Sequence, residues 1–245
     1  MPDSAVSDGG MVLSDVAALV KAWGGDVAKA SAHLPTVTAG GVQSAPTGVI
    51  QDPAGTLFYS QSFSGAGAAS GAIYDLFNNM SDEADHLVVP PKIANGSSIF
   101  NASTGAGGRV LHTFSPYLPA YVKTGPSDAT DRSNALAAIA NGYGTALLAF
   151  SDHYKALGNE GTLLNLVPIS ANYFAGPFGY VKPAWQGGMM DDPVKHLDPS
   201  YTFAALMLAI SAALAKGAHI APMTIYYFDR KVRADATQLA ASLTS

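Results

Sequence analysis

The chain has 245 residues, which is enough for one large domain or two small ones with an ordinary hydrophobic core. It contains no cysteine, so disulfides, thiolate nucleophiles and cysteine-ligated metal clusters are excluded. Charged residues make up only 13% of the chain, and the formal net charge is −5 at pH 7. Its 13 Lys and Arg residues form no basic stripe, so we expect no non-specific binding to nucleic acid.

The N-terminal residues are polar and acidic, without the basic start and apolar core of a secretory signal. The longest apolar run, residues 201–215, is shorter than the roughly 20 residues that cross a bilayer. We therefore expect an intracellular protein that is not inserted in a membrane. The sequence leaves the oligomeric state open.

The first part of the chain is predicted to be helical. Apolar residues on one stripe predict helices over residues 11–34, with an interruption at a Gly-Gly pair. Residues 35–65 change to short β-rich pieces between turn residues. We expect residues 1–40 to form an N-terminal helical extension and residues 41–245 to form one domain.

Helices and buried strands then alternate along the chain. Helical spacing of apolar residues predicts helices over residues 72–80, 131–157, 200–216 and 231–243. Continuous apolar runs predict buried strands over residues 109–114, 162–169 and 223–228. Residues 180–200 lack periodicity and predict an irregular excursion, a candidate lid. Because the interior strands are apolar throughout, the pattern favours α/β layers around a mostly parallel or mixed sheet.

A glycine-rich segment, Gly65-Ala-Gly-Ala-Ala-Ser-Gly71, runs directly into the helix predicted over residues 72–80. Small residues let a ligand approach the backbone, and the free N–H groups of a helix N-terminus favour an anion such as a phosphate. A tight turn that needs glycine only for packing explains the same residues. The segment alone therefore leaves both interpretations open.

A second loop, Pro168-Ile-Ser-Ala-Asn-Tyr-Phe-Ala-Gly-Pro177, follows a predicted buried strand. Ligands in open α/β sheets bind at the carboxyl ends of strands. The Ser170 hydroxyl and the backbone N–H groups are suited to a phosphate, and Tyr173 and Phe174 to covering a sugar ring. The alternative is a loop whose aromatic residues only fill the core.

The six histidines lie far apart in the sequence, so we predict no metal site. His112 lies inside an apolar strand, where a hydrogen-bonded core histidine is the simpler interpretation than a ligand or a base. We also predict no cofactor.

Three segments, in this order, resemble the macrodomain family. They are Gly65-Ala-Gly-Ala-Ala-Ser-Gly-Ala-Ile-Tyr74, Arg109-Val-Leu-His-Thr-Phe-Ser-Pro116 and Leu164-Asn-Leu-Val-Pro-Ile-Ser-Ala-Asn-Tyr-Phe-Ala-Gly176. The family patterns run Gly-Gly-Gly-Val-x-Gly-Ala-Ile-His, Val-Ile-His-Thr-Val-Gly-Pro and Pro-Ala-Ile-Ser-Thr-Gly-Ile-Tyr-Gly. The resemblance covers residues 45–230. It implies a three-layer α/β/α sandwich with a mixed central sheet and a cleft for ADP-ribose.

By this resemblance, the first loop faces the distal ribose and the diphosphate. The second loop closes over the diphosphate from the other side, with Phe174 beside the distal ribose. The implied ligand-binding residues are Gly65, Ala66, Gly67, Ala68, Ala69, Ser70, Gly71, Ser170, Ala171, Asn172, Tyr173 and Phe174. The implied partner is ADP-ribose or an ADP-ribosylated protein.

The resemblance also implies an adenine pocket. The family's adenine-binding aspartate stands in Gly-Asp-Ile, and the aligned piece here is Gly48-Val49-Ile50, with Asp52 as a substitute only if the loop shifts. Residues after the last strand line this pocket in the family, although core packing and a solvated turn explain the same residues. The adenine-pocket candidates are Val49, Ile50, Asp52, Phe228 and Arg230.

The resemblance is weakest at the catalytic residues. Hydrolytic macrodomains carry Asn-Ala-Ala-Asn at the end of the strand before the glycine loop, whereas the corresponding stretch here is Phe58-Tyr-Ser-Gln61. Gln61 and Asp52 remain the catalytic candidates. Three functions stay open: an ADP-ribose-binding module, a mono-ADP-ribosyl hydrolase, and a structural or interaction protein with a degenerate site. The missing asparagines favour binding.

Overall fold

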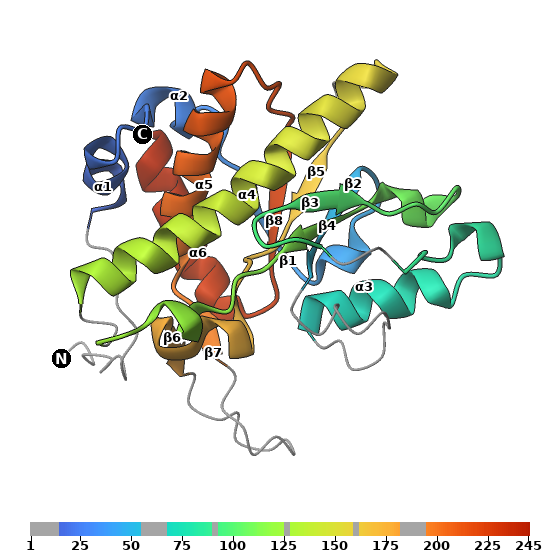
Figure 1. Ribbon diagram of the computed structural model, residues 1–245, viewed down its shortest axis with the longest axis horizontal. Coiled ribbons are helices and arrows are strands. Elements are labelled where there is room, and N and C mark those ends of the chain that lie inside the picture. The colour runs from blue at the N-terminus through green and yellow to red at the C-terminus, as the bar shows by residue number, and fades with distance from the viewer. Residues whose placement is uncertain (1–14, 55–67, 90–92, 125–127, 159–161, 182–194) are drawn as a thin grey trace.

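A six-stranded sheet forms the centre of the computed structural model, which describes residues 15–54, 68–89, 93–124, 128–158, 162–181 and 195–245 (Figure 1). The strand order is β1-β8-β5-β2-β4-β3. These strands are β1 (Thr36–Ala39), β2 (Val49–Ala54), β3 (Ser98–Phe100), β4 (Val110–Phe114), β5 (Leu164–Leu166) and β8 (Met223–Tyr227). Neighbours run parallel except β3, which is antiparallel to β4. The prediction of a mixed sheet is therefore confirmed.

Helices cover both faces of this sheet (Figure 1). The helices are α1 (Val16–Ala22), α2 (Val27–Ser31), α3 (Ala68–Asn78), α4 (Ala129–Leu157), α5 (Pro199–Ala215) and α6 (Arg230–Thr244). The two faces are separated by the alternation of side chains along β2, since Val49 packs with the α4 and α5 core and Ile50 packs with the α3 core. This is the expected α/β/α sandwich.

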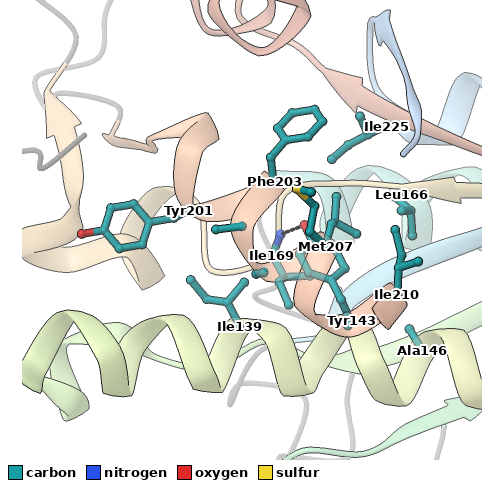
Figure 2. Packing of buried hydrophobic residues seen from close by; sticks show 14 of the residues in the cluster. Ile139, Tyr143, Ala146, Leu166, Ile169, Tyr201, Phe203, Met207, Ile210 and Ile225 are labelled. Carbon is teal, nitrogen blue, oxygen red and sulfur yellow. Dashed lines mark hydrogen bonds between the residues drawn. The ribbon is translucent and has the colours of Figure 1, made fainter. Parts of the chain in front are cut away.

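The larger core lies between the sheet and the helix pair α4 and α5. Figure 2 shows Tyr143 of α4 close to Met207 of α5, in one cluster with sheet residues such as Leu166. Tyr143 of α4 is fully buried, and burial raises the pKa of its hydroxyl. That hydroxyl donates to the carbonyl of Val167 (2.9 Å) and accepts from the N–H of Ile169 (3.1 Å). It therefore anchors the loop that follows β5.

The N-terminal helices α1 and α2 pack against α5. Aspartates cap both helices: Asp15 accepts from the N–H of Ala18 and Asp26 from that of Lys29. Beyond them, β1 is an edge strand that pairs with β8. The stretch that we expected to be a helical extension thus ends in a strand of the sheet. A domain boundary after residue 40 would separate β1 from β8, the strand with which it pairs.

Most predicted elements are present with small shifts of their ends. α4, α5, α6, β4 and β8 confirm the predictions from apolar spacing. The region predicted to be irregular contains the antiparallel pair β6 (Gly179–Val181) and β7 (Lys195–Leu197). β3 was missed because it has only three residues, too few to show a pattern. Among the described residues, no helix combines the length and apolar character needed to cross a membrane.

Candidate functional site

A pocket of about 390 Å³ lies where three neighbouring parallel strands end. Its walls include Gly40 after β1, Val167 after β5 and Tyr227 at the end of β8. The carboxyl ends of parallel strands are where ligands bind in open α/β sheets, and the volume is within the usual range for small-molecule sites. This pocket is therefore our candidate site.

One end of the pocket is built from small residues at a helix N-terminus. α3 begins at Ala68, and the side chains of Ala69 and Ala72 line the pocket with Ala171 from the loop after β5. Methyl groups leave the backbone within reach of a ligand. The first N–H groups of a helix have no partner within the helix and carry its positive dipole end. This end suits an anion such as a phosphate.

The opposite end is aromatic. Phe228 lines the pocket and is 88% exposed, the largest exposure among the exposed large hydrophobic residues of the described chain. It lies next to the segment after β1, because the N–H of Gly40 donates to the carbonyl of Tyr227 (3.3 Å). Asp229 accepts at Oδ1 from the first N–H groups of α6 and so fixes the helix that follows. The free ring face suits stacking with a planar base.

Lysine and arginine are missing from the described walls of the pocket. The ionisable groups among the described lining residues are His196, Asp229 and two tyrosines, Tyr226 and Tyr227. Arg230 is exposed and does not line the pocket. An anion bound here would therefore be held mainly by backbone dipoles.

The first predicted loop is only partly described. Gly65, Ala66 and Gly67 lie outside the described residues, as does Gln61. Ala68 and Ala69 line the pocket.

Two further residues of that loop do not line the pocket. Ser70 turns inward, where its hydroxyl donates to Asp52 Oδ1 (2.6 Å), and Gly71 is not among the lining residues. Ser70 therefore anchors α3 and is not available as a donor to a ligand.

The second predicted loop is also divided between ligand-facing and structural residues. Ala171 lines the pocket, but Ser170 is buried, with φ 57°. Its N–H donates to Ser115 Oγ (2.8 Å) and its hydroxyl to the carbonyl of Pro116 (2.7 Å). These bonds tie the loop after β5 to the loop after β4. The hydroxyl that we expected at a phosphate is thus used by the fold.

Phe174 packs edge-on against Tyr117, with ring centroids 5.8 Å apart. The side chains of Asn172 and Tyr173 lie outside what the structure describes. Gly176 has φ 51° and ψ −128°, and a Cβ there would lie 2.9 Å from Pro119 Cδ. This glycine is required by backbone conformation and packing.

The adenine-pocket candidates in β2 lie elsewhere than expected. Val49 and Ile50 are fully buried, and neither lines the pocket. The reason is that β2 is an interior strand between β5 and β4, so its side chains point into the two cores. The pocket wall is formed instead by Gly41 and Val42, which follow β1.

Asp52 is the centre of a buried polar cluster beneath α3. Its side chain is fully buried and accepts from Ser70 at Oδ1 and from Tyr74 at Oδ2 (2.7 Å). His112 Nδ1 also lies 2.7 Å from Oδ2. Burial and the Asp52 carboxylate raise the pKa of Tyr74, so its hydroxyl stays a donor. Asp52 is thus enclosed by protein donors and does not line the pocket.

Neighbouring groups determine which nitrogen of His112 carries the proton. Asn101 Oδ1 accepts from the N–H groups of Val88 (3.0 Å) and Ser103 (2.9 Å), which orients the amide. Its Nδ2 therefore donates to His112 Nε2 (2.9 Å), and the ring donates from Nδ1 to Asp52. His112 is a hydrogen-bonded core histidine, as predicted.

Sequence reasoning missed the pairing of Asp52 with His112. The two residues are register partners on the parallel strands β2 and β4. Each is a polar residue within a buried strand, which was the available signal, but their register could not be derived from local patterns. Among the described residues, no group of three or more His, Cys, Asp or Glu side chains is arranged to hold a metal ion.

Comparison with solved structures finds proteins with a similar fold. The structure titled alphavirus P23pro-zbd superposes with a TM-score of 0.51 at 13% identity, covering 86% of this chain and 24% of that chain. A mutant of the Oceanobacillus iheyensis macrodomain has a TM-score of 0.46 and 15% identity, covering 84% of this chain and 90% of that chain. No protein-family model and no curated protein sequence matches the chain. At these identities the likeness concerns the fold alone.

Proposed function

We propose that this protein binds ADP-ribose, either free or attached to a target protein, in the pocket at the ends of β1, β5 and β8. The observation that carries the proposal is the chemical division of this pocket. Small residues at the start of α3 form one end, and the exposed ring of Phe228 forms the other. A nucleoside diphosphate sugar has the matching division into an anionic centre and a planar base.

The sequence motifs add independent support. The glycine-rich segment before α3 and the loop after β5 both resemble macrodomain segments, and residues of both line the same pocket. The pocket brings together segments about a hundred residues apart, since Ala69 and Ala171 both contribute. Such convergence is expected of a ligand site and is not required by a tight turn.

Binding is proposed in preference to hydrolysis. A hydrolase needs a group that activates or orients water beside the ligand. Asp52 is enclosed by three protein donors, and Gln61 lies outside the described residues. No described group therefore favours hydrolysis specifically.

Calorimetric titration with ADP-ribose tests the proposal directly. We expect saturable binding, and a rise in melting temperature, because a ligand at 100 times its Kd adds about 2.7 kcal/mol to the free energy of unfolding. Neither heat nor a melting shift with millimolar ADP-ribose would overturn the proposal. Loss of label from a mono-ADP-ribosylated protein would instead identify a hydrolase.

The variant Ala69→Glu tests the placement of the anion. A carboxylate in the first turn of α3 is compatible with the helix dipole, so we expect the fold to be retained. The same charge lines the pocket and should repel the diphosphate, weakening ADP-ribose binding at least about thirtyfold. Ala234→Glu, at an exposed position of α6, is the matched control and should bind normally. Full binding by Ala69→Glu would contradict the placement.

A further inference from the structure

At the aromatic end of the pocket, Gln43 contributes an uncharged carboxamide to the lining. Gln43 lines the pocket in the short helical turn Val42–Ser44, directly after β1, and is half-buried. Its carboxamide lies over Gly41, since a Cβ built on Gly41 would be 2.6 Å from Gln43 Cδ. The absence of a side chain at residue 41 therefore makes the space that this carboxamide occupies.

The carboxamide of Gln43 is available to a ligand. Among the described residues, it makes no hydrogen bond with another side chain or with the backbone. It shares this end of the pocket with Phe228, because Gly40 is hydrogen-bonded to the last residue of β8. A base stacked on Phe228 would thus present its edge near this amide, while the carboxylate of Asp229 in the same wall caps α6 through Oδ1.

An amide and a carboxylate read a purine edge differently. A carboxylate only accepts hydrogen bonds, whereas a terminal amide both donates and accepts. Adenine presents a 6-amino donor beside the N1 acceptor, and hypoxanthine presents a 6-oxo acceptor beside an N1–H donor. Rotating the amide by half a turn exchanges its donor and acceptor, so one glutamine satisfies either edge.

We propose that Gln43 is the base-reading residue and that the site accepts purine nucleoside diphosphate riboses with either a 6-amino or a 6-oxo group. This inference rests on the proposed function, because it assumes that the base occupies the aromatic end. It goes further by naming the residue that sets specificity and the ligand class that follows from it.

The test compares ADP-ribose with inosine diphosphate ribose, which differs only at the purine edge, by calorimetric titration of the intact protein. We expect the two Kd values of the unaltered protein to agree within about threefold. Gln43→Ala should weaken both ligands to a similar extent, by about tenfold, because each loses its edge partner. Gln238→Ala, an exposed glutamine on α6, is the matched control and should change neither Kd.

The possible results separate this inference from the proposed function. If the unaltered protein binds ADP-ribose at least about tenfold more tightly than its inosine counterpart, ADP-ribose binding stands and the relaxed specificity is overturned. If Gln43→Ala leaves both affinities unchanged, Gln43 is not the base-reading group. If it weakens only one, Gln43 does not read both edges and the relaxed specificity is overturned. If neither ligand binds at millimolar concentration, the proposed function fails and the inference fails with it.

Discussion

Asp52 and Phe228 lie near the same pocket but differ in burial, and we expect them to affect different properties of the protein. Asp52 is fully buried and joins β2 to α3 through Ser70 and Tyr74 and to β4 through His112. Phe228 is almost fully exposed, so in the proposed function it would contribute only when a ligand covers it. The first residue should therefore control stability, and the second should control affinity.

Asp52→Asn should destabilise the protein by about 3 kcal/mol. The carboxylate accepts hydrogen bonds at both oxygens, so an amide would direct its own N–H groups at a neighbouring donor. Urea denaturation measures the free energy of unfolding, with Asp235→Asn on the exposed side of α6 as control. A loss below about 1 kcal/mol would contradict this account of the cluster.

Phe228→Ala should weaken ADP-ribose binding by about tenfold, the loss expected when a base loses its stacking partner. The free energy of unfolding should change by less than about 0.5 kcal/mol, because the ring is 88% exposed. Calorimetry and urea denaturation on the same preparation separate the two effects. Val88→Ala, another exposed apolar residue outside the pocket, is the control. Unchanged affinity would show that the base does not stack here.

Among the described helices that pack on the sheet, α4 is the longest. It has 29 residues and contacts β3, β4 and α5. Asp128 caps its start by accepting from the N–H groups of Thr130 and Asp131, and Gly158 ends it with φ 68°. Capping satisfies backbone groups that the helix cannot pair internally. The charge of Asp128 adds a favourable interaction with the helix dipole.

The cap of α4 makes stability depend on pH in the acid range. Hydrogen bonds from the backbone of Asp131, and then of Thr130, lower the pKa of Asp128 below its ordinary value of 3.8. A carboxyl whose pKa is lower in the folded than in the unfolded chain stabilises the fold at pH values above its unfolded pKa. This stabilisation is lost as the pH falls through the folded pKa.

We expect Asp128→Asn to be less stable than the unaltered protein at pH 6, and to approach its stability as the pH falls below the ordinary carboxyl pKa of 3.8. Asparagine also caps helices, so the comparison isolates the charge. Melting temperatures from pH 6 to pH 2.5 test this, with Asp152→Asn on the exposed face of α4 as control. A stability difference that stays constant with pH would contradict the assignment.

At the scale of the whole molecule, the low content of charge distinguishes this protein. Only 13% of its residues are charged, and none of the described pocket-lining residues is Lys or Arg. Long-range attraction of an anionic ligand is therefore weak, and short contacts with backbone N–H groups must supply the affinity.

The affinity for ADP-ribose should accordingly depend little on salt. Raising NaCl from about 50 to about 500 mM should change the Kd by less than about threefold, because backbone dipoles act at short range and release few ions. Titrations at several salt concentrations measure this slope. A tenfold weakening would show that basic side chains outside the described walls hold the diphosphate.

Local patterns in the sequence were sufficient to predict most of the helices and strands. The apolar runs of β4 and β8 and the helical spacing of α4 lie within short windows, so the fold class could be inferred without knowing any tertiary contact. The same holds for His112, whose apolar surroundings predicted a core role.

Only the tertiary structure decided which residues of those segments face the pocket. Asp52 and His112 are 60 residues apart, and their pairing depends on the register of β2 against β4. Ser70 and Ser170 look like ligand donors in the sequence, but each uses its hydroxyl inside the fold. Gln43 gave no signal of its own, because its position depends on β1 pairing with β8. The sequence determined where helices and strands form, because hydrophobic periodicity is a local property. Which side chains face the pocket depends on strand register, which is set by contacts between distant parts of the chain.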